Sequence, residues 1–120
     1  MHIIFGEEQA VVLAEKYTVL ELDTLQFEPN GPLATAYCVI ENISLTDLPQ
    51  VESMRNLHSQ LIVNYRRQDW NYCNQALDQL IGFWSGEVDS FYAELRNRIA
   101  KYIEQDPGES WDGIIKKHTA

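Results

Sequence analysis

The chain has 120 residues, of which 45% are hydrophobic, and carries a formal net charge of −9. This length corresponds to one domain, residues 1–120, and this apolar fraction is enough for a core without disulfides or a metal. No apolar run reaches the roughly 20 residues that a membrane helix needs. The N-terminus lacks a basic segment and becomes acidic at Glu7, so a signal peptide is not expected. We therefore expect a cytoplasmic protein that does not bind a membrane.

The acidic residues are concentrated toward the N-terminus. Residues 1–54 hold nine acids and one lysine, whereas residues 55–120 hold nine acids and eight bases. Such charge repels phosphate backbones and disfavours direct binding of nucleic acid. Two interpretations remain, a solvated polar surface or an acidic face that mimics nucleic acid as a decoy.

Motifs that would announce a chemistry are absent from the sequence. It contains no P-loop, GxGxxG, HExxH, EF-hand or GxSxG pattern. Cys38 and Cys73 fall in different predicted elements without the spacing of a metal site, so we expect two buried free thiols. No cofactor, no metal and no catalytic residue is predicted, and an enzyme becomes the less favoured class.

The first 45 residues predict the α/β part of the fold. Residues 3–5 form a short apolar run typical of a strand, and the acids after Gly6 favour a helix of about ten residues. A β-hairpin is predicted over residues 17–41, with Gly31 free to take a positive φ in its turn. The return strand is apolar on both faces, which suggests helices on one face and a second subunit on the other.

Residues 46–120 predict the helical part, with three helices and a final helical turn. Helix starts are predicted at Thr46 or Asp47, at Asp69, at Asp89 or Ser90, and at Ser110, whose turn would carry Trp111, Ile114 and Ile115. The predicted apolar stripes are Val51, Met54, His58, Leu61, Ile62 and Tyr65 in the first helix, Trp70, Cys73, Ala76, Leu77, Leu80, Ile81 and Trp84 in the second, and Val88, Phe91, Leu95, Ile99, Tyr102 and Ile103 in the third. The sequence therefore predicts an α+β fold, with the strand, helix and hairpin packed on a three-helix segment.

Landmarks in the helical part resemble a known module. The run Tyr65-Arg66-Arg67-Gln68-Asp69-Trp70, followed by Ala76 and by Trp111-Asp112-Gly113, resembles the tetratricopeptide-type tail of many bacterial adenylate cyclases. The chain lacks a cyclase catalytic domain, so the resemblance implies helical packing and no nucleotide chemistry.

The whole chain is also similar to small proteins encoded by tailed bacteriophages of marine bacteria. The segments that carry this similarity are residues 5–9, 17–23 and 86–92. It implies a phage source and the cytoplasm of the host cell, and brings no activity with it.

Two sets of residues are candidates for a site. His58 titrates near neutrality, but it lies in an apolar stripe without a carboxylate at ligand spacing, so we expect a structural histidine with one hydrogen-bond partner. The alternative is a small enzyme or ligand-binding protein with a pocket near His58, Tyr65 and Arg66.

The second set is the basic and aromatic cluster of Tyr65, Arg66, Arg67 and Trp70. The arginines would grip a phosphate or an acidic partner segment, or simply neutralise a helix C-terminus. Trp70 is the preferred anchor of a partner surface. The favoured function is a non-enzymatic protein–protein interaction module that forms a homo-oligomer, with itself or another protein as the partner.

Overall fold

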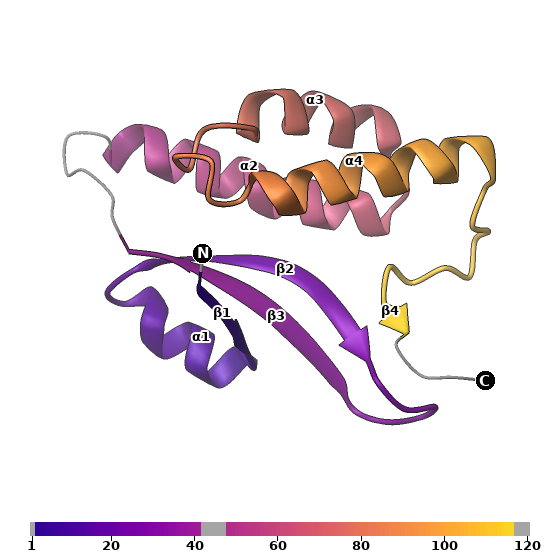
Figure 1. Cartoon of the computed structure of the whole chain (residues 1–120), viewed down its shortest axis with the longest axis horizontal. Helices are drawn as coiled ribbons and strands as arrows, with labels where there is room; N and C mark the ends of the chain where they lie inside the picture. The colour runs from indigo at the N-terminus through magenta and orange to yellow at the C-terminus, as the bar shows by residue number, and fades with distance from the viewer. Residues whose placement is uncertain (1, 42–47, 117–120) are drawn as a thin grey trace. The chain divides into compact units, whose positions relative to one another are not determined.

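The computed structural model describes residues 2–41 and 48–116, except for the side chain of residue 116. The fold is α+β, as predicted, and divides into two compact units (Figure 1). We call residues 1–42 with 113–120 the sheet unit and residues 43–112 the helical unit. The predicted caps Thr46 and Asp47 lie outside the described residues. No described helix is long and apolar enough to cross a membrane.

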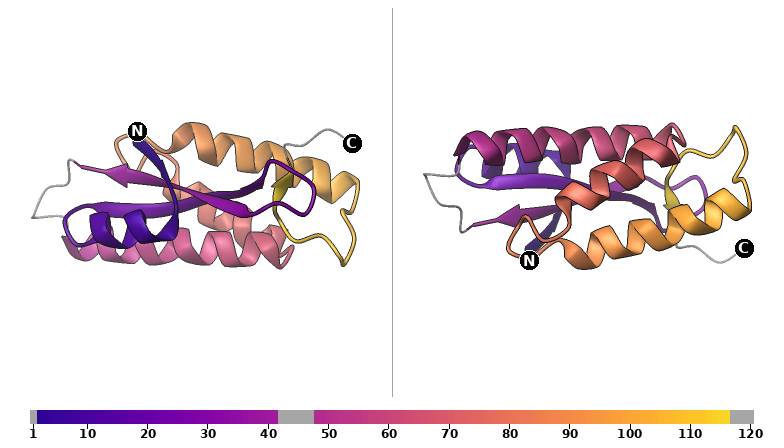
Figure 2. Two further views of the ribbon diagram at one scale, coloured as in Figure 1. Left: turned by 90° about the horizontal axis from the view of Figure 1, so that it is seen from below. Right: turned by 90° about the horizontal axis from the view of Figure 1, so that it is seen from above.

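The described residues of the sheet unit form four strands and one helix. These are β1 (His2–Phe5), α1 (Glu7–Ala14), β2 (Thr18–Gln26), β3 (Leu33–Ile40) and β4 (Ile115–Lys116). The strand order is β1-β3-β2-β4, and β3 runs antiparallel to both β1 and β2. The helix α1 contacts β1, β2 and β3, and lies along one face of the sheet (Figure 1 and Figure 2). The predicted first strand and hairpin are therefore confirmed.

The hairpin turn differs from the prediction in one residue. Gly31 donates its N–H to the carbonyl of Glu28 at 2.9 Å, which closes the turn. The positive φ of 58° belongs to Asn30, one residue before the predicted position. Asparagine tolerates this left-handed conformation better than most residues. Glycine suits position 31 for a different reason, because a Cβ there would lie 3.0 Å from the Glu28 carbonyl oxygen, closer than most such contacts.

The final helical turn predicted from Ser110 is wrong. Residues 115–116 form strand β4, which pairs parallel with β2 through Ile115 opposite Leu25. Gly113, at φ 76°, redirects the chain just before this strand. Isoleucine is β-branched and therefore suits a strand. The main chain of β2 offers hydrogen-bonding groups to this segment, whereas a single isolated helical turn is costly to form.

The helical unit consists of α2 (Leu48–Arg66), α3 (Trp70–Leu80) and α4 (Asp89–Glu104). The helix α3 packs beside both α2 and α4 (Figure 2). Asp69 caps α3 as predicted, since its Oδ1 accepts the Tyr72 N–H at 3.1 Å. The buried apolar residues are Val51, Leu61, Ile62, Tyr65, Cys73, Ala76, Leu77, Leu80, Trp84, Val88, Phe91, Tyr92, Leu95 and Ile99. These residues follow the helical spacing of the sequence and form one core. Two members of the predicted stripes are not part of it, since Ile81 is 42% exposed just beyond the end of α3 and Ile103 is 59% exposed in the last turn of α4.

Two helix boundaries differ from the prediction. The helix α3 ends at Leu80, because Ile81 is extended and Gly82 has a φ of 86°. Trp84 therefore lies in the turns that connect α3 to α4 and not in a helix, although its side chain is buried. The residue at the N-cap of α4 is Val88, without a side-chain cap. Asp89 Oδ1 accepts the Gly82 N–H at 2.7 Å, so this carboxylate satisfies the connecting loop and not its own helix.

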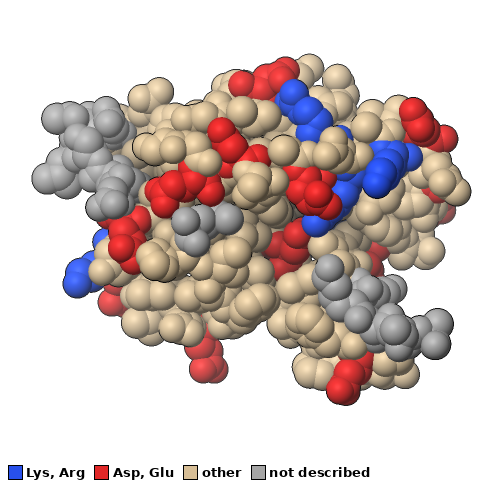
Figure 3. Space-filling view, in the orientation of Figure 1, with Lys and Arg blue, Asp and Glu red and all other residues tan. Residues whose placement is uncertain are grey.

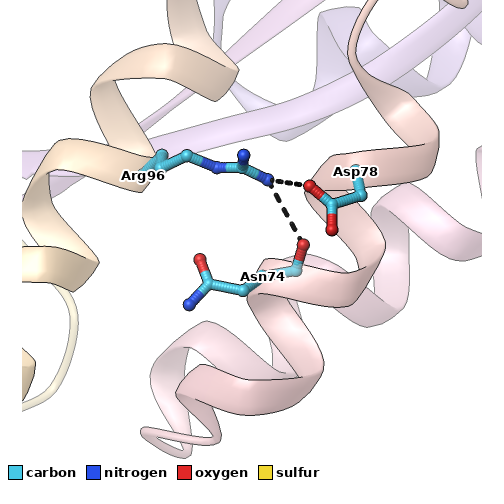
Figure 4. Close-up of polar contacts among 3 residues, drawn as sticks. All are labelled: Asn74, Asp78 and Arg96. Atoms are coloured by element: carbon cyan, nitrogen blue, oxygen red, sulfur yellow. Dashed lines mark hydrogen bonds and ion pairs between the residues drawn. The ribbon is translucent and has the colours of Figure 1, made fainter.

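Arg96 links α4 to α3. Its Nη2 donates to Asp78 Oδ1 at 2.7 Å and to the Asn74 carbonyl oxygen at 3.3 Å (Figure 4). The guanidinium therefore fixes one turn of α3 through both a side chain and a main-chain acceptor. Its Nε is buried without a hydrogen-bond partner among the described residues, which offsets part of this gain.

Candidate functional site

His58 lies in a line of three polar side chains within the helical core. Its Nδ1 is 2.9 Å from the Tyr92 hydroxyl, and Trp84 Nε1 donates to that same hydroxyl at 3.0 Å. Indole N–H groups only donate, so the Tyr92 oxygen accepts from Trp84. The same oxygen therefore serves both ring nitrogens, and the direction of its hydrogen bond with His58 Nδ1 depends on the tautomer of the imidazole.

This line is closed to solvent. His58 is 1% exposed, Tyr92 0% and Trp84 4%, and the rings of His58 and Tyr92 lie 5.7 Å apart. A ligand at His58 would have to displace a buried hydroxyl that already serves two partners. The arrangement agrees with the structural histidine expected from the sequence. The sequence analysis did not identify Tyr92 as the partner of His58, although its spacing of three and seven residues from Leu95 and Ile99 is that of a core position.

The basic and aromatic cluster predicted from the sequence is split by the fold. Tyr65 is buried and Trp70 half-buried, whereas Arg66 and Arg67 are exposed at the end of α2. The rings of Tyr65 and Trp70 lie 5.9 Å apart in an edge-to-face arrangement. The structure therefore brings the two aromatic residues together but leaves the two arginines on the surface.

Two further rings complete a four-ring cluster, which we define as Tyr65, Trp70, Tyr102 and Trp111. Trp111 lies 5.2 Å from Tyr65, 5.7 Å from Trp70 and 5.0 Å from Tyr102, and Trp70 stacks on Tyr102 at 5.5 Å. At these separations the rings contact one another. The cluster therefore attaches the loop after α4 to the end of α2, the start of α3 and the end of α4. Gln68 supports the same loop, since its Nε2 donates to the Gly108 carbonyl oxygen at 2.7 Å.

Burial also suppresses the reactive groups of this unit. Burial raises the pKa of the Tyr65 hydroxyl well above its ordinary value, although a hydrogen bond with Arg98 opposes the shift. Burial raises the pKa of the Cys73 thiol to about 12, with a smaller contribution from Asp69. Both groups are therefore protonated at neutral pH, and neither is an activated nucleophile. Cys38 and Cys73 are both buried thiols outside any disulfide, as the sequence predicted.

No group of three potential metal ligands is found among the described residues. The described residues also expose several large apolar side chains. In the sheet unit they are Ile3, Phe5, Val11, Val12, Phe27 and Leu33. Four of these six belong to β1 and α1.

The strand β1 forms one edge of the sheet, and in the described part of the chain no strand pairs with its outer side. The Gly6 N–H donates to the Thr35 carbonyl, which makes this a hydrogen-bonded pair of the antiparallel ladder. Pairs alternate along such a ladder, so Ile4 opposite Tyr37 is also hydrogen-bonded, whereas Ile3 and Phe5 direct their main-chain groups outward. Their side chains are 50% and 51% exposed. This apolar edge is the feature that sequence reasoning missed.

The two units share the negative charge. The sheet unit contains seven acids and three bases, and the helical unit eleven acids and six bases. On the face drawn in Figure 3, acidic and basic side chains both lie over the helices. The excess of acids in the first 54 residues of the sequence therefore does not become an excess in one unit of the fold.

Comparison of the chain with protein-family models, with curated proteins and with solved structures finds no match.

Proposed function

We propose that this protein is a non-enzymatic protein–protein interaction module that forms a homo-oligomer. The observation that carries the proposal is the apolar edge strand β1, whose Ile3 and Phe5 are half exposed. An exposed edge of this kind is a template for pairing with another chain, unless charged residues or proline prevent it. The segment His2–Phe5 contains no proline, lysine or acid.

The burial of the potentially reactive side chains also favours an interaction module over an enzyme. His58 and Tyr92 are occupied by each other in the core, and the Cys73 thiol is buried with a raised pKa. The alternative of an enzyme or ligand-binding protein near His58, Tyr65 and Arg66 would require this core to open. The nearly even share of negative charge between the two units likewise gives no support to the acidic decoy. The resemblance to phage proteins makes the host cytoplasm the proposed place of action.

Sedimentation equilibrium over a wide range of protein concentration tests the proposal. We expect a mass that rises from one chain toward a small multiple of it, without precipitation. A mass of one chain at every concentration would contradict the homo-oligomer. A screen of metabolites and nucleotides for a shift in melting temperature is the parallel experiment, and a saturable shift would favour the ligand-binding alternative.

A further inference from the structure

We infer that β1 pairs with β1 of a second copy, antiparallel and across a two-fold axis at Ile4. This inference rests on the proposed function, because it names the surface and the symmetry of the association. The occupant of the edge follows from three features of the described residues: the outward main-chain groups, the register that they impose and the charges on the competing edge.

The main-chain groups require a strand as the partner. Ile3 and Phe5 each direct an N–H and a C=O away from β3 at the edge of the sheet. A side chain or a helix face cannot satisfy this row of alternating donors and acceptors, whereas a further strand does so. An added antiparallel strand continues the sheet beyond β1.

The register then makes the strand complementary to itself. The outward groups form hydrogen-bonded pairs when Ile3 of one copy lies opposite Phe5 of the other. The two-fold axis repeats this pair and places Ile4 opposite its own copy, so the contact is isologous and closed. Pairs of an aromatic and a β-branched residue are favourable neighbours across strands. The exposed side chains of Ile3 and Phe5 meet in such a pair twice.

Charge distinguishes this edge from the other free edge in the sheet unit. The strand β2 pairs with β4 only at Leu25 and Gln26, which leaves its outer edge from Thr18 onward without a strand among the described residues. That edge carries Glu21 and Asp23 and a register shift between Glu21 and Thr24. Acids and bulges are the features that prevent edges from pairing, particularly between copies that each carry a charge of −9. In the antiparallel β1 pair, Glu7 and Glu8 of the two copies lie at opposite ends of the shared ladder.

Proline at position 3 tests the main-chain contact. The variant Ile3→Pro removes an outward N–H but none of the ladder bonds to β3, so the sheet unit keeps its fold. Ile3→Ala is the matched control for the lost side chain. We expect Ile3→Pro to weaken the dimer at least about tenfold and Ile3→Ala to weaken it less. Phe5→Lys provides a second test, since lysine on an edge strand is a natural block to pairing, and we expect it to give a monomer.

Hydrogen exchange followed by NMR examines the same contact in the wild-type protein. We expect the Ile3 and Phe5 amides to become protected as the concentration rises, while the Ile4 amide stays protected throughout. Val12→Glu changes an exposed residue of α1, 66% exposed, and should leave the association unchanged.

The outcomes separate the inference from the proposed function. A wild-type mass of one chain at every concentration overturns both, and leaves the edge for an extended segment of a different protein. An oligomer that Ile3→Pro and Phe5→Lys do not weaken, or whose Ile3 and Phe5 amides exchange freely, overturns the inference alone. Loss of association in Val12→Glu with an intact Ile3→Pro oligomer places the contact on α1 instead.

Discussion

The Tyr92 hydroxyl lies 2.9 Å from His58 Nδ1 and accepts the indole N–H of Trp84 at 3.0 Å. One buried oxygen therefore satisfies two ring nitrogens that come from α2 and from the connection between α3 and α4. Removing a single atom tests how much this arrangement stabilises the helical unit.

We expect Tyr92→Phe to lower the free energy of unfolding by about 2–3 kcal/mol, because two buried polar groups lose this partner while the ring volume is unchanged. Urea denaturation measures the loss. His58→Phe combined with Tyr92→Phe should be less damaging than the sum of the two single variants, since the histidine no longer needs a partner. Strictly additive losses would show that the two residues do not act together.

The helices illustrate what periodicity can and cannot predict. Apolar residues at spacings of three and four placed most of the buried faces of α2, α3 and α4, since packing one stripe of each helix is what forms the core, but Ile81 and Ile103 at the ends of these stripes are exposed. The role of Asp89 was not predictable in this way. Its carboxylate was expected at a helix start, but the nearby Gly82 N–H was the donor that it satisfied. Whether Asp89 accepts from its own helix or from Gly82 depends on the conformation of the loop between α3 and α4, which the spacing of residues in the sequence does not reveal.

Trp111 is predicted to hold the loop after α4 in place. Trp111→Ala removes ring contacts with Tyr65, Trp70 and Tyr102, and should destabilise the protein by about 2–3 kcal/mol. The near-UV circular dichroism of the remaining coupled rings should fall as well. Ile103→Ala is the control, because this apolar residue of α4 is 59% exposed and should change stability by less than about 0.5 kcal/mol. Equal losses in the two variants would argue against a special role for the four-ring cluster.

The candidate sites were predictable only where their members are close in sequence. Tyr65 and Trp70 flank one short connection, so their contact followed from the predicted helix ends. The contact of Trp111 with Tyr65 and Trp70 depends on the path of the loop after α4. The pairing of Ile115 with Leu25 joins segments that lie far apart in the sequence. The exposed edge of β1 likewise depends on strand order, because β3 and not β2 lies beside it.

The ion pair of Arg96 and Asp78 should contribute little to the free energy of unfolding, in contrast to the buried hydrogen bonds of Tyr92. Their side chains are 41% and 70% exposed, and exposed pairs are worth roughly 0–1 kcal/mol. We expect Asp78→Asn to lower stability by less than about 1 kcal/mol, with the difference from wild type decreasing as salt is added. Arg96→Met should be equally mild, because it also removes the buried Nε that has no described partner. A loss of several kcal/mol in either variant would contradict this interpretation.

Stability at high pH tests the buried thiol of Cys73. Its pKa is raised from the ordinary 9.0 to about 12 in the folded chain, so the unfolded chain loses this proton first as the pH rises. The unfolded state then binds fewer protons than the folded state, and the free energy of unfolding falls as the pH increases from about 9 toward 12. Below pH 9 the contribution of the thiol is fully present. Cys73→Ala creates a small cavity and is less stable at neutral pH, but its loss of stability above pH 9 should be shallower by up to about 1.4 kcal/mol per pH unit. Tyr65→Phe provides the comparison, since the pKa of that hydroxyl is raised in the same direction. Parallel curves for wild type and Cys73→Ala between pH 9 and 12 would show that the thiol titrates alike in the folded and unfolded chains.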